Sequence, residues 1–172
     1  MIRLAEPNDL EAIMEIVRLA IPEMRRAGND QWKEDYPLSA DFRKDIDHRE
    51  LYVAEIDGRV AGFICINGLE PEEYQDAEWS VDATPLVLHR MAVSPAYARQ
   101  GVGSRLMAFA EELALSQGIT YLRSDTNSHN PNMNGLFQKF NYRFAGITHF
   151  PGRVTDFNCY EKVLDPQRAK RA

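Results

Sequence analysis

The chain has 172 residues, of which 44% are hydrophobic and 27% charged, and its formal net charge is −6. This composition is that of an ordinary globular domain and excludes a disordered or fibrous chain. Because an acidic chain lacks the positive charge that binding to a phosphate backbone needs, we expect no nucleic-acid partner.

No apolar run approaches the ~18 residues of a membrane span, and the first ten residues lack the apolar core of a signal peptide. We therefore expect a cytoplasmic protein with no membrane partner. The two cysteines, Cys65 and Cys159, form no CxxC pair, and no histidine lies at metal-ligand spacing. We expect two reduced thiols and no metal site.

Hydrophobic spacing predicts strands and helices along the whole chain. In chain order these are a strand at 2–5, helices at 7–28 and 39–47, a strand hairpin over 51–66, a strand at 85–93, a helix from 102 closed by Gly118, a strand at 119–126, a helix at 131–140, and strands at 143–150 and 157–164. This order favours one α/β domain over 1–164 with a mixed sheet, followed by a loose tail over 165–172.

Short polar signals mark several boundaries. Ser39 is the expected cap of the second helix. Asp57-Gly58 is a dipeptide that a two-residue hairpin turn favours, because both central residues need positive φ. Residues 68–82 carry six carboxylates and neither lysine nor arginine. They show no clear period, so we expect a surface loop, which could attract a cationic ligand.

Gly101 and Gly103 stand at the start of a predicted helix, where glycine costs about 1 kcal/mol relative to alanine. The first N–H groups of a helix have no internal partner and carry partial positive charge, so a pyrophosphate can bind them. Glycine removes the Cβ that would block close approach, and Arg99 and Arg105 add positive charge. We interpret the turn as a phosphate site; a plain strand-to-helix turn is the alternative.

Two other phosphate motifs are incomplete here. A P-loop needs Gly-Lys-Ser/Thr, which the stretch GVGSRL lacks. A dinucleotide-binding fingerprint needs a third glycine where Leu106 stands. Asp125, 22 positions past Gly103, keeps a dinucleotide-binding oxidoreductase open as an alternative.

Two spaced motifs carry a family resemblance. The pattern V-x-P-x-[YF]-x-x-x-G-x-G is matched by Val93, Pro95, Tyr97, Gly101 and Gly103. Asn130, followed by LFQKFNY over 136–142, is similar to the second block of the same family. The chain thus resembles the GNAT superfamily of N-acetyltransferases over nearly its whole length.

The resemblance implies a single domain with a mixed, mostly antiparallel sheet, helices on both faces and a splayed central strand pair. It implies acetyl-CoA as cofactor, lying between the strands at 86–93 and 119–126, with its pyrophosphate on the N–H groups of 99–104. The cofactor-binding residues that it implies are Met91, Ala92, Val93, Arg99, Gln100, Gly101, Val102, Gly103, Ser104, Asn130 and Phe137.

The implied activity is transfer of an acetyl group to a primary amine by direct attack in a ternary complex. Phe137 stands where relatives often carry the tyrosine that protonates the leaving thiolate, so a non-catalytic acyl-CoA-binding module is an alternative. A thiol of pKa about 8.5 leaves as an anion only about 2 kcal/mol above its neutral form at pH 7. An alkyl ammonium must lose a proton at a cost of roughly 4 to 5 kcal/mol, so the reaction needs a base more than an acid.

His89 and Asp125 are the candidate catalytic bases. His89 lies in the strand beside the expected cofactor, and we expect its side chain to share a face with Met91 and Val93; a packed or surface histidine is the alternative. Asp125 ends the neighbouring strand, where a turn-capping aspartate is the alternative.

Trp32 and Tyr36 lie between the first two predicted helices. In this superfamily that segment commonly walls the acceptor cleft, so the resemblance assigns both side chains to a small-molecule or peptide amine. Core packing is the alternative for both aromatic rings. The C-terminal strands pair between subunits in many relatives, which makes a homodimer possible.

Overall fold

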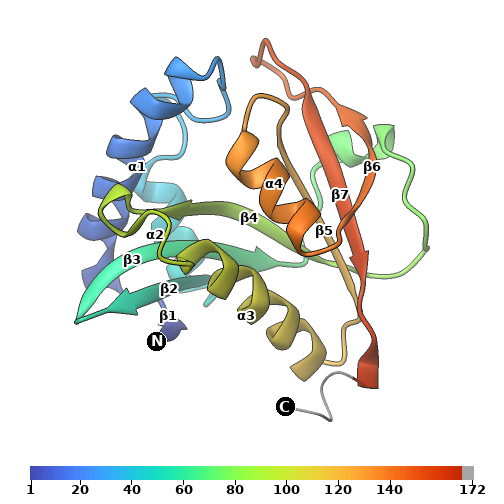
Figure 1. Cartoon of the computed structure of the whole chain (residues 1–172), viewed down its shortest axis with the longest axis horizontal. Helices are drawn as coiled ribbons and strands as arrows, with labels where there is room; N and C mark the ends of the chain where they lie inside the picture. The colour runs from blue at the N-terminus through green and yellow to red at the C-terminus, as the bar shows by residue number, and fades with distance from the viewer. Residues whose placement is uncertain (168–172) are drawn as a thin grey trace.

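The computed structural model describes residues 1–167; residues 168–172, the end of the expected loose tail, lie outside the described residues. Within 1–167, seven strands form one sheet in the order β1-β2-β3-β4-β5-β7-β6 (Figure 1). The strands are β1 (Ile2–Leu4), β2 (Leu51–Ile56), β3 (Arg59–Asn67), β4 (Leu86–Val93), β5 (Tyr121–Asn127), β6 (Arg143–Thr148) and β7 (Phe157–Val163). The helices are α1 (Leu10–Arg26), α2 (Ser39–Asp47), α3 (Val102–Ser116) and α4 (Pro131–Lys139). The mixed, mostly antiparallel sheet of an α/β fold is confirmed.

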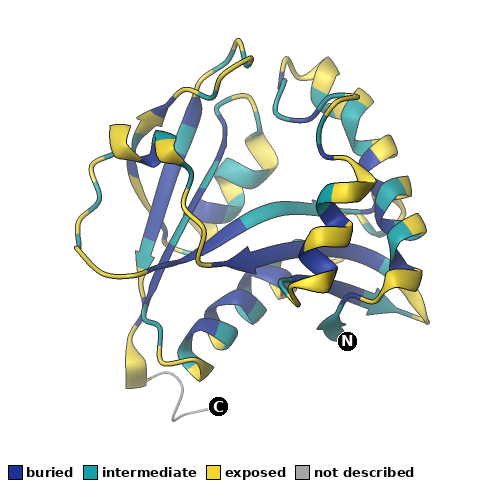
Figure 2. Ribbon diagram, turned by 180° about the vertical axis from the view of Figure 1, so that it is seen from behind, coloured by how far each residue is buried: buried dark blue, intermediate teal, exposed yellow. Residues whose placement is uncertain are grey.

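Helices cover both faces of the sheet. Ile64 and Ile66 of β3 pack with α3 in one core, whereas Phe63 and Cys65 pack with α1 and α2 in the other. This division follows from strand geometry, because successive side chains point to opposite faces. Residues 61–67 of β3 and 86–88 of β4 are buried, as the dark blue ribbon in Figure 2 shows. None of the described helices is long and apolar enough to cross a membrane.

β4 and β5 part soon after they meet. These parallel strands pair only where Leu86–Leu88 face Leu122–Ser124. Farther along, β4 pairs only with β3, and β5 pairs only with β7. Within residues 1–167, the edges of β4 and β5 that face each other therefore have no strand partner there. The two strands diverge in Figure 1, which confirms the splayed central pair.

A bulge in β4 lies beside this split. Two residues of β4, Arg90 and Met91, face one residue of β3, Ile64, and Arg90 has a φ of +35°. The extra residue reverses the alternation of side chains along the rest of the strand. His89 therefore lies on the α1–α2 face, whereas Met91 and Val93 pack with α3. The expectation that these three share a face is wrong for this reason.

An ion pair anchors the bulge to α2. Arg90 donates from Nε and Nη2 to the two carboxylate oxygens of Asp45 at 2.9 and 2.7 Å, and from Nη1 to the Tyr36 hydroxyl at 3.0 Å. The Asp45 side chain is only 5% exposed. Burial raises the pKa of Asp45, and the charge of Arg90 opposes this. Because removing one partner would leave a buried charge unpaired, the pair holds α2 and Tyr36 in place.

The local turn signals have mixed outcomes. Asp57 and Gly58 both have positive φ, at 49° and 73°, as predicted for the hairpin. The predicted cap of α2 is wrong, because Ser39 is its first helical residue and Leu38 is the N-cap. The Asp41 carboxylate accepts the Leu38 N–H at 2.7 Å, so the cap contact of α2 runs from its first turn back to the N-cap backbone.

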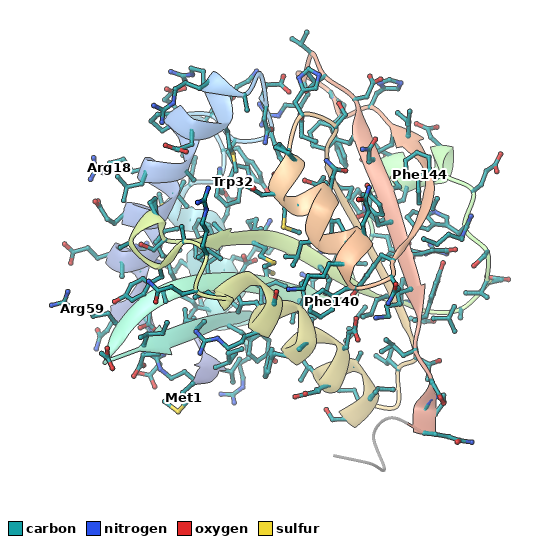
Figure 3. The ribbon with its side chains drawn as sticks, in the orientation of Figure 1. Met1, Arg18, Trp32, Arg59, Phe140 and Phe144 are labelled. Carbon is teal, nitrogen blue, oxygen red and sulfur yellow. The ribbon has the colours of Figure 1, made fainter. Side chains whose placement is uncertain are left out.

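The acidic segment 68–82 is more than a surface loop. It contains a short 3₁₀ helix, η2 (Glu72–Asp76), and buries Tyr74 in a third core with Val87 and Cys159. The same segment packs against β6, where the Glu78 N–H donates to the Ala145 carbonyl at 2.7 Å. β6 is an edge strand of the sheet and leaves Phe144 49% exposed (Figure 3). Pairing of two copies through the C-terminal strands stays a prediction.

We expect Gly62→Ala to lower the free energy of unfolding by about 1 to 3 kcal/mol, because overpacking shifts backbone. A Cβ at Gly62 would lie 2.8 Å from the Ala92 carbonyl oxygen and 3.1 Å from a Val102 methyl, where β3, β4 and α3 meet. Gly68→Ala is the control, since a Cβ there meets nothing within 4 Å. Urea unfolding measures both variants, and equal midpoints would contradict the prediction.

Candidate active site

A cavity of about 300 Å³ lies where β4 and β5 part. One part of its wall comes from the α3–α4 face of the sheet and the other from the α1–α2 face. The side chains that line it include Met91, Met107 and Met133 from the first face and Trp32, Tyr36 and Asp125 from the second. Two reactants on opposite faces can therefore meet through the gap in the sheet.

The cavity collects six of the fifteen predicted site residues. Those that line it are Trp32, Tyr36, His89, Met91, Asp125 and Asn130. Asn130 also caps α4, because its side chain accepts the Met133 N–H at 3.1 Å. Ala92, Val93 and residues 99–104 lie outside the lining. Phe137 is fully buried and stacks on Tyr160 at 4.7 Å, so it presents no surface to the cavity.

Asp125 is the first residue of β5 beyond the pairing with β4. The residue is half-buried and lines the cavity, and Tyr74 donates a hydrogen bond to Oδ1 at 2.8 Å. Burial raises the pKa of Asp125 to about 6; the Tyr74 bond opposes the rise and the charge of Glu73 adds to it. At neutral pH this carboxylate is ionised, yet it is a stronger base than an ordinary aspartate.

His89, the first residue of β4 beyond the same pairing, is held as a neutral donor. Its Nε2 lies 2.9 Å from Oδ1 of Asn67, which also accepts the Leu69 N–H. The Asn67 amide is oriented by Glu50, which accepts from its Nδ2 at 2.9 Å, so His89 Nε2 carries a hydrogen. Burial lowers the pKa of His89 to about 4, with Arg90 adding to the effect. His89 is therefore a weak base.

The two predicted acceptor aromatics line the cavity from the segment after α1. Trp32 is 4% exposed and stacks on Phe63, with ring centroids 6.2 Å apart; Figure 3 labels it between α1 and α4. Tyr36 accepts its hydrogen bond from Arg90 and so keeps its own O–H as a donor. Both residues serve the core and the cavity wall at once.

The turn before α3 offers a set of unused backbone donors. The N–H groups of residues 101–104 make no backbone hydrogen bond within residues 1–167, and the first helical bond runs from the Arg105 N–H to Gly101. Gly101 has a φ of +77°, which suits glycine, and a Cβ there would meet nothing within 4 Å. Unpaired amides at a helix start fit a diphosphate.

Gly103 has a different role from the one expected. A Cβ there would point inward, 3.4 Å from atoms of Met91 and Leu136, and not toward a ligand. Gly103 therefore belongs to the packed interface of α3 with β4 and α4, where a Cβ would make only ordinary contacts. Lys139 of α4, which the sequence did not single out, donates to Ser104 Oγ at 2.8 Å and brings a cation to the same turn.

Sequence reasoning also missed Tyr74 and Arg153. Tyr74 contacts Asp125 across 51 positions, and Arg153 joins the cavity from the β6–β7 loop. Tyr74 lies in a segment without periodicity, and Arg153 lies in a turn, so neither had a local signal. Only the packing of distant segments brings them to the cavity.

Comparison with known proteins identifies the class. Residues 13–142 match the family model described as Acetyltransferase (GNAT) family. The chain belongs to this family, and it is an N-acetyltransferase that takes the acetyl group from acetyl-CoA. Membership also sets aside the dinucleotide-binding alternative.

Individual relatives agree with this assignment. An uncharacterized N-acetyltransferase, YesJ of Bacillus subtilis (strain 168), is 25% identical over 164 residues, which cover 91% of this chain and 86% of that protein. The crystal structure of a GNAT-family acetyltransferase from Streptococcus agalactiae superposes with a TM-score of 0.85 at 28% identity, covering 96% and 95% of the two chains. The fold is shared with YncA of Salmonella typhimurium, whose structure contains acetyl-CoA (TM-score 0.71, 18% identity, 96% and 94% covered).

We expect Asp125→Asn to be more stable than the parent protein above pH 6. The native pKa of about 6 exceeds the ordinary value of 3.8, so the native state binds this proton more tightly than the unfolded state. The contribution of this group to the free energy of unfolding is therefore fully present below about pH 4 and is lost as the pH rises through 6. The free energy of unfolding of the variant should exceed that of the parent protein by about 2 kcal/mol at pH 8 and by almost nothing at pH 4. The value at pH 8 is reduced for screening by water in the cavity.

Thermal unfolding of both proteins from pH 4 to pH 8 measures this difference. Asp82→Asn, at an exposed position, is the control and should show no gain that depends on pH. A gain for Asp125→Asn that is the same at every pH would contradict the assignment of a raised pKa.

Proposed function

We propose that this enzyme transfers the acetyl group to a primary amine by direct attack, with Asp125 as the general base. The observation that carries the proposal is the carboxylate of Asp125 at the point where β4 and β5 part, with a pKa of about 6. A base must be ionised at the working pH and still hold a proton well, and a pKa just below 7 meets both needs.

Asp125 serves this role better than His89. The amine enters as an ammonium ion and must lose a proton before it attacks. The Asp125 carboxylate attracts the ammonium and accepts that proton, directly or through a cavity water. His89, with a pKa of about 4, holds a proton poorly, and its Nε2 already donates to Asn67.

Direct attack is supported by the state of the available nucleophiles. Cys65 and Cys159 are fully buried, and burial raises the pKa of each thiol to about 12, so neither forms a thiolate near neutral pH. Ser124 lines the cavity, but its hydroxyl donates to the Leu88 carbonyl at 2.8 Å and makes no hydrogen bond to a base within residues 1–167. The chain therefore needs no covalent acetyl-enzyme.

The donor is proposed to lie on the α3–α4 side of the gap. When bound, acetyl-CoA supplies an activated thioester. The amides of residues 101–104 would hold its diphosphate, with Lys139 and Arg105 adding positive charge. The edge of β4 from Met91 to Val93, which lacks a strand partner on its β5 side within the described chain, would hold the pantetheine.

We expect kcat/KM for the amine-dependent release of thiol from acetyl-CoA to fall at acid pH, with the midpoint of this acid limb near pH 6. Tyr74→Phe removes the hydrogen bond that lowers the pKa of Asp125, so the limb should move to higher pH. Asp125→Asn should lower kcat roughly 10²- to 10⁴-fold, the usual range for a lost general base. A panel of primary amines, followed by thiol release, provides the rates.

Tyr52→Phe is the control, because Tyr52 lies on β2 and packs against Phe109 of α3, away from Asp125. It should leave the acid limb unchanged. A limb that stays in place in Tyr74→Phe, together with a fully active Asp125→Asn, would assign the base to another group. Binding of acetyl-CoA without thiol release for any amine would favour the non-catalytic module.

We expect Gly101→Ala to weaken coenzyme A binding about tenfold, measured by calorimetry. Alanine at a φ of +77° is strained by about 1 to 2 kcal/mol, so the turn relaxes and its amides lose their alignment. Gly58→Ala is a matched control: its φ is +73°, its Cβ also has open space, and it lies in the β2–β3 turn. Unchanged affinity in Gly101→Ala would contradict the diphosphate site.

A further inference from the structure

We propose that the acceptor is an amino acid or a closely similar small amine that carries a carboxylate, and that Arg153 binds this carboxylate. The inference rests on the proposed function and adds the substrate class. It follows from the charges on the cavity wall, from the way the β6–β7 loop is held, and from the donors beside it.

Arg153 is the one charged side chain of the described cavity lining that has neither a partner nor the proposed role of base. Its guanidinium makes no ion pair or hydrogen bond within residues 1–167; only its backbone N–H is used, donating to Phe150 at 3.1 Å. Arg90, the other lining cation, is committed to Asp45. A guanidinium beside a cavity is a strong site for a carboxylate, which it binds through two parallel hydrogen bonds.

The loop that carries Arg153 is held in place. Asp30, in the segment after α1, accepts a hydrogen bond from the Val154 N–H at 2.7 Å and another from the Thr155 hydroxyl. Lys33 reaches the Gly152 carbonyl at 3.4 Å. The two loops lie next to each other at the top of Figure 1. These bonds fix the backbone on both sides of Arg153 at the cavity.

Three neutral groups of the same cavity lining are also donors. Tyr36 keeps its O–H, and the Trp32 indole N–H and the Gln31 amide nitrogen make no hydrogen bond within the described chain. The carboxylate of Asp125 is the only anionic side chain in the described lining. The wall thus offers a proton acceptor for an amine and several donors for an anion, which is the charge pattern of an amino acid.

Size and charge narrow the class further. A cavity of about 300 Å³ is at the small end for ligand sites. Phe150 and Phe157, edge to face with ring centroids 4.8 Å apart, add an apolar wall that suits an apolar side chain. A polyamine would bring a second positive charge toward Arg153. A phosphate would bring nearly two negative charges to a single unmatched cation.

The test compares L-phenylalanine with L-phenylalaninamide and 2-phenylethylamine, and L-methionine with L-methioninamide, by thiol release from acetyl-CoA. We expect kcat/KM for each acid to exceed that for its amide at least tenfold. Arg153→Gln should raise KM for the acids at least tenfold, with little change in kcat or in the rates of the amides. Arg153→Lys should restore part of the preference.

Arg59→Gln, an exposed position in the β2–β3 hairpin far from the cavity (Figure 3), controls for the lost charge and should leave all rates unchanged. Amides or 2-phenylethylamine that react as well as the acids would overturn the inference but not the proposed function. An equal loss of kcat/KM for acids and amides in Arg153→Gln would also overturn the inference but not the proposed function.

Absence of thiol release with every probe would count against the proposed function, and binding then tests the carboxylate site by itself. Calorimetry with N-acetyl-L-phenylalanine and its amide should show at least tenfold tighter binding of the acid to the parent protein. That preference should vanish in Arg153→Gln. Equal binding of acid and amide to the parent protein would overturn the inference.

Discussion

The early end of the β4–β5 pairing is the constraint on which the rest of the site depends. Three residue pairs join the strands, and the Ser124 hydroxyl adds a bond to Leu88 at the last of them. Beyond that point each strand is held by its outer neighbour alone, so the sheet opens without losing its core. The gap supplies unpaired backbone on β4 and a passage between the two faces.

The bulge in β4 decides which side chains face which side of the sheet. With Arg90 as the extra residue, Met91 turns to the α3–α4 side and His89 to the side of Trp32 and Tyr36. The Arg90–Asp45 pair makes this arrangement costly to undo, because either charge alone would be buried without a partner. The ion pair therefore also positions one wall of the cavity through Tyr36.

The environment of Asp125 trades stability for basicity. Desolvation raises its pKa, which weakens the fold at neutral pH and strengthens the group as a base. Tyr74 moderates the shift and keeps the carboxylate ionised. The amides before α3 and the guanidinium of Arg153 have no hydrogen-bond partner among residues 1–167, so both leave donors that a ligand can use.

The sequence alone was enough to predict the order of strands and helices, the Asp57-Gly58 turn, the family and the acetyl donor, because hydrophobic periodicity and short glycine motifs are local signals. It could not predict the face of His89, since a one-residue bulge reverses alternation and has no local signature here. It also missed Tyr74, Lys139 and Arg153, which reach their partners across 35 to 51 positions or join the cavity from a loop. Only the tertiary structure decided these contacts and the pKa values of His89 and Asp125, because burial and the charges of distant segments set them.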